Sequence, residues 1–428
     1  MERKIEEQLL AWKNKTDDRL PLIVNGARQV GKTYILRKFG EEQFKNVVYI
    51  NLETNLTIAS YFNDNIAPER LLRYLEASTG ERIIPEETLI IFDEIQSSER
   101  ALTALKYFCE ETPEYHIAGS LLGVAINRQH YSFPVGKVET LTLYPLDFEE
   151  YLGARSQKLL SEEIRRAYEK MEPLPDALHQ KAIELYREYL LIGGMPACIN
   201  AFLKSGSFLD VPLVQNEILD NYIADMAKYA SNTDSVKIRA CYNSIPAQLA
   251  KDNKKFQYKV VQKGGSAALF GASIEWLNLA GVVLKCQRIN QAFEPIAVYA
   301  DLSAFKLYMG DVGLLTMKSG LSQQTVLSGE GNTFMGAVTE NYVAQQLAAK
   351  GYDLYYWESS STAELDFVLQ KGNQIVGVEV KKGEHVRSRS LSVFVDSYKP
   401  AYSVRLSLKN FGEKDGLKSV PLYAAFCV

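Results

Sequence analysis

Short apolar runs alternate with segments of helical periodicity along the first 120 residues. The runs are residues 20–24, 47–50, 89–92 and 115–118. Near-continuous apolar runs of this length, separated by helices, are typical of strands buried on both faces of a parallel sheet. The pattern predicts an α/β domain with helices on both faces of its sheet, and we assign it to residues 1–153.

The pattern changes after residue 153. Residues 154–235 have helical periodicity broken by prolines and by the turn Gly193-Gly194-Met195-Pro196, so we expect a helical lid or connector. In residues 236–310, helical patterns at 236–251 and 266–280 precede strand-like runs at 282–289 and 296–300. Helices followed by a small hairpin indicate a winged-helix-like region.

The last part of the chain, residues 311–428, mixes both periodicities. A helical pattern at 335–350 is followed by alternating strands at 353–358, 364–370 and 375–382. We therefore predict a second α/β domain here.

A lysine-rich stretch interrupts the winged-helix-like region. Its basic residues are Lys251, Lys254, Lys255, Lys259 and Lys263, against one acid, Asp252. Such a stretch is suited to DNA phosphates, but it is equally typical of the solvated face of a connector.

A phosphate-binding motif follows the first apolar run. Gly26-Ala27-Arg28-Gln29-Val30-Gly31-Lys32-Thr33 matches G-x-x-x-x-G-K-[ST] and opens a helical pattern. Glycines let backbone amides approach phosphate oxygens, and the start of a helix favours anions. Lys32 is then placed for the β- and γ-phosphates of ATP, and the Thr33 hydroxyl for Mg²⁺.

Two adjacent acids end the third apolar run. In Leu89-Ile-Ile-Phe-Asp93-Glu94, the strand delivers both carboxylates to the edge of the sheet where ligands bind. We predict that Asp93 holds Mg²⁺ and that Glu94 polarises the attacking water. Taken alone, the pair also fits a solvated strand end or a helix cap.

Ser120 follows the fourth run. If its strand lies between those of Val24 and Asp93, the hydroxyl lies near the γ-phosphate and can sense hydrolysis. The alternative is an ordinary serine cap for a helix at 121–128.

These motifs carry a family resemblance that covers nearly the whole chain. Together with the segment Leu143-Tyr-Pro-Leu-Asp-Phe-Glu-Glu-Tyr-Leu152 and the Gly193–Pro196 turn, they resemble AAA+ type ATPases of bacteria and archaea whose C-terminal domain of unknown function is restriction-endonuclease-like. The resemblance implies an AAA+ core, a nucleotide-sensing Ser120 and an arginine finger in a Gly-Arg pair. Here that pair is Gly136-Lys137, which lacks the guanidinium fork, and Arg128 is the alternative.

A β-hairpin is predicted near the end of the chain. The turn Gly372-Asn373 joins two alternating runs and places Asp366 opposite Glu379, with Glu364 opposite Lys381. Two facing carboxylates repel each other, and Mg²⁺ bound by Asp366 and Glu379 relieves that repulsion.

The hairpin resembles that of the PD-(D/E)xK nucleases. The resemblance implies that Asp366, Glu379 and Lys381 of this chain are catalytic. It also implies that Glu340 supplies a third acid from a preceding helix. Alternatives remain open: a solvent-facing hairpin with a Glu364–Lys381 pair, and a solvated helix position for Glu340. A basic cluster follows, suited to DNA phosphates or simply solvated: Lys381, Lys382, His385, Arg387 and Arg389.

Composition narrows the class of protein. The net charge of −4 over 428 residues requires any site for a polyanion to be local, and no apolar window approaches the length of a membrane helix. The charged first turns contain no signal core, and five dispersed cysteines fit reduced thiols, so we expect a cytoplasmic protein.

The sequence thus predicts an ATP- and Mg²⁺-dependent AAA+ ATPase with a nuclease-like C-terminal domain. DNA is a candidate partner and oligomerisation is a further possibility. The alternative is an ATP-switched regulator, binding DNA or protein, whose C-terminal domain is not catalytic.

Overall fold

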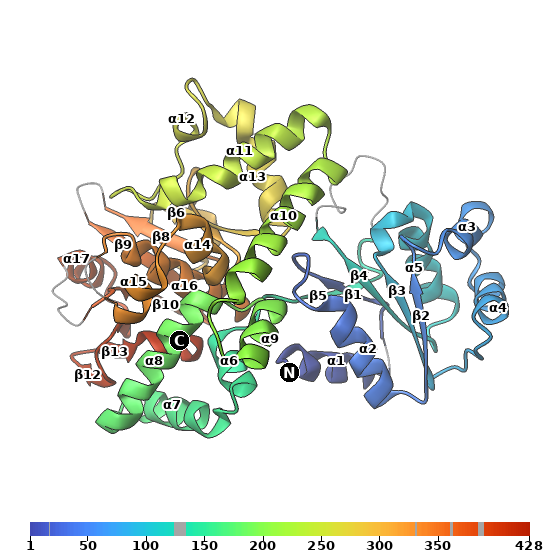
Figure 1. Cartoon of the computed structure of the whole chain (residues 1–428), viewed down its shortest axis with the longest axis horizontal. Helices are drawn as coiled ribbons and strands as arrows, with labels where there is room; N and C mark the ends of the chain where they lie inside the picture. The colour runs from blue at the N-terminus through green and yellow to red at the C-terminus, as the bar shows by residue number, and fades with distance from the viewer. Residues whose placement is uncertain (17, 124–133, 330–331, 360–362, 384–388) are drawn as a thin grey trace. The chain divides into compact units, whose positions relative to one another are not determined.

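The computed structural model describes residues 1–16, 18–123, 134–329, 332–359, 363–383 and 389–428 (Figure 1). Contacts within these residues divide the chain into two compact units. The N-terminal unit consists of residues 2–144 with 279–281, and the C-terminal unit of the remaining residues.

The N-terminal unit contains a five-stranded parallel sheet within its described residues. The strands are β1 (Leu22–Asn25), β2 (Asn46–Asn51), β3 (Thr88–Asp93), β4 (His116–Leu121) and β5 (Glu139–Thr142). Their order is β2-β3-β4-β1-β5, and every neighbouring pair is parallel. The four predicted apolar runs are β1 to β4, so the predicted parallel α/β fold is confirmed.

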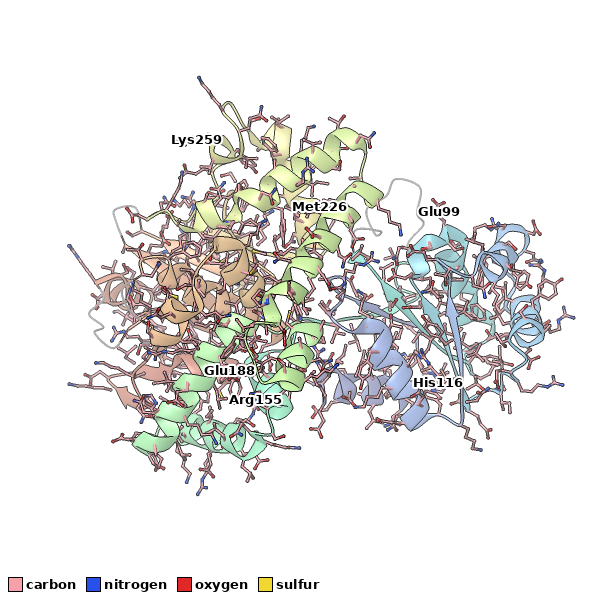
Figure 2. All side chains as sticks on the ribbon, in the orientation of Figure 1. Glu99, His116, Arg155, Glu188, Met226 and Lys259 are labelled. Atoms are coloured by element: carbon pink, nitrogen blue, oxygen red, sulfur yellow. The ribbon has the colours of Figure 1, made fainter. Side chains whose placement is uncertain are left out.

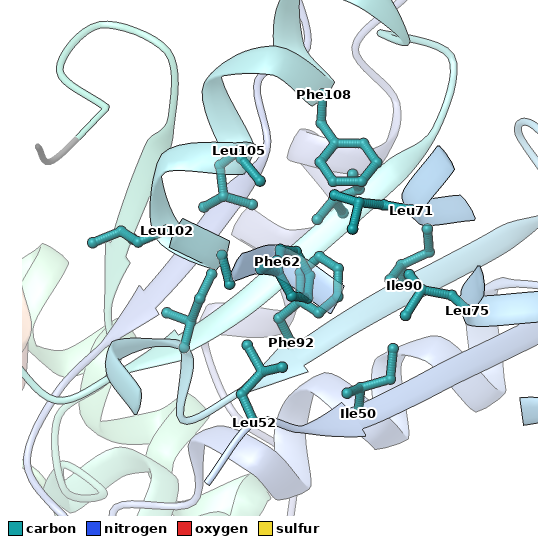
Figure 3. Packing of buried hydrophobic residues seen from close by; sticks show 14 of the residues in the cluster. Ile50, Leu52, Phe62, Leu71, Leu75, Ile90, Phe92, Leu102, Leu105 and Phe108 are labelled. Atoms are coloured by element: carbon teal, nitrogen blue, oxygen red, sulfur yellow. The ribbon is translucent and has the colours of Figure 1, made fainter. Parts of the chain in front are cut away.

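Helices flank this sheet and close its core. They are α1 (Ile5–Lys13), α2 (Lys32–Gln43), α3 (Leu56–Asp64), α4 (Pro68–Thr79), α5 (Glu99–Glu111) and the 3-10 turn η1 (Ile95–Ser97). Figure 3 shows apolar side chains of α3, α4 and α5 meeting those of β2 and β3. Phe92 lies at the centre of this core. The centre of the Phe92 ring is 5.6 Å from that of Phe62 and 6.3 Å from that of Phe108. Burial of β3 between such layers fixes the point at which its last residue, Asp93, emerges.

The C-terminal unit contains an eight-stranded mixed sheet within its described residues. Its strands are β6 (Val283–Ile289), β7 (Ala300–Met309), β8 (Tyr355–Glu358), β9 (Glu364–Lys371), β10 (Gln374–Val380), β11 (Ser403–Ser407), β12 (Gly412–Lys414) and β13 (Leu417–Pro421). Their order is β12-β13-β11-β10-β9-β8-β6-β7.

Helices make up the rest of this unit. Those lying wholly or mainly in it are α6 (Phe148–Ala154), α7 (Lys158–Lys170), α8 (Asp176–Ile192), α9 (Pro196–Ser205), α10 (Val211–Tyr229), α11 (Asn232–Leu249), α12 (Tyr258–Val261), α13 (Ala267–Leu279), α14 (Val312–Ser319), α15 (Gln323–Ser328), α16 (Met335–Ala349) and α17 (Arg389–Tyr398), with 3-10 turns η3 (Ile296–Tyr299) and η4 (Leu422–Cys427). A salt bridge of 2.8 Å from Arg155 to Glu188 ties the end of α6 to α8 (Figure 2). Across the described part of the chain, every helix is too short or too polar to cross a membrane.

The structure differs from the sequence-based expectation for residues 236–310. The predicted helices are present as α11 and α13, but the second strand begins at Ala300, and residues 296–299 form the 3-10 turn η3. The β6–β7 hairpin is not a separate wing, because β6 also pairs in parallel with β8. The expected boundaries at 235 and 310 therefore fall inside one compact unit, and the boundary expected at 153 lies at residue 144. The winged-helix prediction did not anticipate the pairing of β6 with β8, because these strands lie far apart in the sequence.

The two motif segments beyond the phosphate loop pack against each other. The backbone N–H of Leu146 donates to the carbonyl of Gly194 at 2.8 Å, and Asp147 caps α6 in a capping box with Glu150. The Asp311 carboxylate accepts the Gly194 N–H at 2.6 Å. A Cβ at Gly194 would lie 2.1 Å from the Leu146 carbonyl oxygen. Leu146, Asp147 and Gly194 therefore serve packing within the C-terminal unit.

We predict that Gly194→Ala destabilises the C-terminal unit by about 1–3 kcal/mol, because the added methyl group overlaps backbone that cannot move freely. Gly336→Ala is the matched control, since a Cβ at that helical position meets no atom within 4 Å. Urea unfolding followed by tryptophan fluorescence measures both changes. Equal midpoints for the two variants would contradict the close approach.

Candidate functional site

The phosphate-binding motif forms a loop between β1 and α2. Three of its residues have positive φ: Gly26 at 145°, Gln29 at 67° and Gly31 at 101°. A Cβ at Gly26 would lie 2.2 Å from the Leu143 carbonyl oxygen, so only glycine fits there. Left-handed residues directly before a helix start gather backbone amides into an anion-binding concavity. The local backbone therefore has the form that the motif predicts.

Lys32 spans this loop. Its ammonium donates to the carbonyl oxygens of Gly26 and Ala27, each at 2.8 Å, and the side chain is buried. When a nucleotide binds, the Lys32 ammonium can give up these two neutral carbonyl acceptors and donate to an anionic phosphate oxygen, which forms the stronger hydrogen bond.

The Thr33 hydroxyl, in the first turn of α2, meets the Asp93 carboxylate at the end of β3. Thr33 Oγ1 donates to Asp93 Oδ1 at 2.9 Å, as the predicted Mg²⁺ pair requires. Asp93 is 3 % exposed, and its other donors are Tyr49 Oη at 2.7 Å, Asn51 Nδ2 at 3.3 Å and the Ser120 hydroxyl. A hydroxyl and a carboxylate are oxygen ligands of the type Mg²⁺ prefers, so this pair fits the ion.

Two of these donors were missed from the sequence. Tyr49 and Asn51 end β2, and the register pairs Asn51 directly with Asp93. Polar residues at the end of an apolar run next to the acid strand are the signal that identifies them. Burial, together with the bond to Asp93, raises the pKa of the Tyr49 phenol, so it stays a donor at neutral pH.

The strand that carries Ser120 has the predicted place in the sheet. β4 runs between β3 and β1, and the Ser120 hydroxyl accepts the Glu94 backbone N–H at 3.0 Å while donating to Asp93. The hydroxyl therefore links both acids. Most of the helix that it might cap, 121–128, lies outside the described residues.

Glu94 turns the chain out of β3. Its φ is 52°, in the left-handed region that non-glycine residues rarely adopt, and its carboxylate accepts a hydrogen bond from the Gln96 amide. Backbone strain of this kind is concentrated at functional sites and is held by surrounding contacts. The turn separates the direction of Glu94 from that of Asp93, which suits two different roles.

Arg3 supports the phosphate loop and was not singled out from the sequence. It lies directly before α1 and is 8 % exposed. Its guanidinium donates to the carbonyl oxygens of Val30 at 3.2 Å and Tyr144 at 2.7 Å. One arginine thus joins the loop to the end of the unit.

The two candidate arginine-finger positions, Lys137 and Arg128, stay predictions. Lys137 forms a 3.0 Å ion pair with Glu110 near the surface. Arg128 lies outside the described residues.

A second charged cluster lies on the sheet of the C-terminal unit. The β9–β10 hairpin has the predicted register, with Lys371 paired to Gln374. Glu340 in α16 is 2 % exposed, so it is not a solvated helix position. Its carboxylate accepts from Lys254, from Lys306 at 3.0 Å and from Tyr308 Oη at 2.5 Å.

The other predicted residues of this cluster have basic or backbone partners of their own. Lys381 pairs with Glu379 at 3.2 Å and not with Glu364. Arg405 also contacts Glu379, at 3.1 Å, and Asp366 accepts the Val380 N–H at 2.8 Å. Within the described residues, no three His, Cys, Asp or Glu side chains are arranged to hold a metal ion. The Mg²⁺ site expected at Asp366 and Glu379 stays a prediction.

The lysine-rich stretch is partly used inside the protein. Lys254 pairs with Glu340 and Lys255 with Glu358, which leaves Lys259 and Lys263 exposed. Fewer lysines of this stretch are therefore available to contact DNA phosphates. Of the basic cluster after the hairpin, His385 and Arg387 lie outside the described residues.

Three family models match parts of this chain. A model described as an AAA domain matches residues 18–152, and two domains of unknown function, DUF8612 and DUF4143, match residues 183–325 and 335–425. Uncharacterized proteins of Mycobacterium bovis and Mycobacterium tuberculosis are each 37% identical to it over 79 residues, which is 18% of this chain and 18% of each relative.

Solved structures resemble the chain at low identity. A Walker-type ATPase of Pyrococcus abyssi has a TM-score of 0.46 at 14% identity, over 74% of this chain and 95% of that one. Cdc6p of Pyrobaculum aerophilum has a TM-score of 0.25 at 13% identity, over 76% and 94%. AMPPCP-bound DnaA of Aquifex aeolicus has a TM-score of 0.28 at 13% identity, over 65% and 90%.

We predict that Arg3→Met weakens nucleotide binding roughly tenfold, because the Val30 carbonyl loses a charged donor and the loop loses its support. Titration with a fluorescent ATP analogue measures the dissociation constant.

Arg19→Met is the matched control. The Arg19 side chain is 7% exposed, pairs with Glu86 at 2.9 Å and donates to the backbone carbonyls of Lys15 and Pro113, away from the phosphate loop in the same unit. Equal weakening by both substitutions would show that Arg3 acts on general stability alone.

Proposed function

We propose that this chain, whose residues 18–152 belong to the AAA domain family, binds ATP with Mg²⁺ and hydrolyses it. The observation that carries the proposal is the hydrogen bond between the Thr33 hydroxyl, in the first turn of α2, and the Asp93 carboxylate, at the end of β3, directly after the phosphate loop.

Each residue of the site has a distinct task. The amides of residues 26–33 and the Lys32 ammonium bind the phosphates, and Thr33 and Asp93 hold Mg²⁺. When bound, Mg²⁺ neutralises charge on the phosphate oxygens. Glu94 orients the attacking water and accepts its proton, and Ser120, bonded to the Glu94 backbone and to Asp93, keeps the two acids at fixed positions.

We predict that Glu94→Gln retains nucleotide binding and lowers the rate of hydrolysis by roughly 10²-fold or more, because the amide cannot accept the proton from water. Lys32→Ala instead loses tight binding. Phosphate release measures turnover. Melting temperature with and without Mg-ATP measures binding, since a ligand at about 100 times its dissociation constant stabilises by about 2.7 kcal/mol. Wild-type protein that neither melts higher with Mg-ATP nor releases phosphate would refute the proposal.

For the C-terminal unit we propose a restriction-endonuclease-like core that binds DNA under the control of the nucleotide state. The support is its topology. α16 precedes the strands β8, β9 and β10, which lie side by side in antiparallel pairs, and α17 connects to β11, parallel to β10. We also propose a cytoplasmic location, supported by five free thiols, and the formation of oligomers.

We predict that fluorescence anisotropy gives different DNA affinities in the ATP and ADP states, with steep weakening by salt. Lys259→Glu with Lys263→Glu should weaken binding in both states, because these lysines are exposed in the described structure. Lys255→Met is the control, since that side chain is already paired with Glu358. Nucleotide-independent, salt-insensitive binding would contradict this role.

A further inference from the structure

A fully buried lysine stands inside the carboxylate cluster of the C-terminal unit. The Lys306 side chain, on β7, has no exposed surface, and its ammonium lies 3.0 Å from Glu340 and 2.5 Å from Glu364. The same ammonium lies 4.9 Å from the centre of the Tyr356 ring. A side chain enclosed on a sheet strand cannot turn its charge to water, so this cation is a permanent part of the cluster.

A second lysine reaches the cluster from a segment that is itself anchored. Lys254 pairs with Glu340 and keeps 22% of its side chain exposed. Two residues on, the Phe256 N–H donates to the Phe305 carbonyl at 2.8 Å, and the two rings stack at 5.4 Å. The Gln248 side chain makes two hydrogen bonds of 3.0 Å to the backbone of Gln257. These contacts hold Lys254 over the acid.

The charges in the cluster are mutually stabilised. Burial alone would lower the pKa of the Lys306 ammonium, but Glu340, Glu364 and Asp366 raise it well above its usual value. Burial alone would raise the pKa of Glu340, but Lys306 and Lys254 hold it low. Glu340 and Lys306 are therefore both charged at neutral pH.

Three carboxylates around the hairpin are ion-paired: Glu340 with Lys254 and Lys306, Glu364 with Lys306, and Glu379 with Lys381 and Arg405. The fourth, Asp366, accepts the Val380 N–H, and burial together with the neighbouring Glu340 raises its pKa to about 6. A divalent ion needs oxygens that no cation already occupies. It would also be repelled by Lys306, which cannot leave.

We infer that Lys306 and Lys254 are the resident counter-cations of this cluster, which is therefore a closed ion-pair site with no place for a divalent metal ion. The C-terminal unit then has the strand order of a metal-dependent nuclease without its metal. The cluster holds β7, α16 and β9 together, and the unit acts on a partner by binding and not by cleaving it. This inference does not depend on the proposed ATPase activity, but it rests on the restriction-endonuclease-like core proposed for the C-terminal unit.

Electron paramagnetic resonance of full-length protein titrated with Mn²⁺ tests the inference. Without nucleotide we expect no tightly bound Mn²⁺, and with a non-hydrolysable ATP analogue one Mn²⁺ per chain. Asp93→Asn removes that ion, whereas Asp366→Asn leaves it in place. Mn²⁺ bound without nucleotide and lost in Asp366→Asn would overturn the inference, as would DNA cleavage by wild type that Asp366→Asn abolishes. No Mn²⁺ bound even with the analogue would refute the ATP proposal alone.

A second variant keeps the test decisive if Asp366→Asn does not fold. Lys254→Met removes the partly exposed cation and should raise the affinity of nucleotide-free protein for Mn²⁺ by roughly tenfold or more, because one positive charge beside the acids is gone. Lys259→Met, in the same lysine-rich stretch but exposed, should change nothing. Equal Mn²⁺ affinity in wild type and Lys254→Met would show that Lys254 does not guard the acids, and would overturn its assigned role.

Discussion

One buried carboxylate organises the candidate nucleotide site. Asp93 ends strand β3 and accepts hydrogen bonds from the C-terminal part of β2, the C-terminal part of β4 and the first turn of α2. A carboxylate that is 3 % exposed is tolerated only when donors replace its lost water, and each charge-assisted bond contributes roughly 1.5–3 kcal/mol. The same bonds that keep the charge buried therefore align the separate strand ends. The loop geometry and the separate direction of Glu94 build on that alignment.

Local sequence patterns were sufficient to predict much of the nucleotide site and of the hairpin. Apolar runs identify strands buried on both faces, and the glycine motif specifies a loop whose positive φ angles the structure shows at Gly26, Gln29 and Gly31. The Gly372-Asn373 turn specifies the hairpin register without any tertiary information. Even the position of Ser120 follows, because a strand placed between the other two brings its end to the same edge of the sheet.

What the sequence could not predict depends on pairings between distant segments. Nothing local indicates that β6 pairs with β8, so its hairpin looked like an independent wing. Lys306 and Lys254 read as ordinary basic residues, since their acidic partner Glu340 lies far along the chain. Arg3 looked like part of a charged, solvated first turn, and only the fold brings it under the Val30 carbonyl.

The two acidic clusters differ in the kind of donor that satisfies them. Every donor to Asp93 is uncharged: two aliphatic hydroxyls, a phenol and an amide. Its negative charge is solvated but not neutralised, so it remains available to a cation. Glu340 is held by two ammonium groups, and its charge is already cancelled.

The consequence for metal binding follows from Coulomb's law. Two unit charges 4 Å apart interact by about 4 kcal/mol at an effective dielectric constant of 20, and a divalent ion doubles that figure. Beside Asp93 this energy favours the ion. Beside Glu340 the attraction is offset by repulsion of similar size from each lysine, and Lys306 is enclosed on β7 and cannot retreat. Uncharged donors leave the negative charge of a carboxylate available to a metal ion, whereas buried lysines neutralise it. The sequence alone does not distinguish these two cases, because each shows only an acidic residue in or beside a strand or helix.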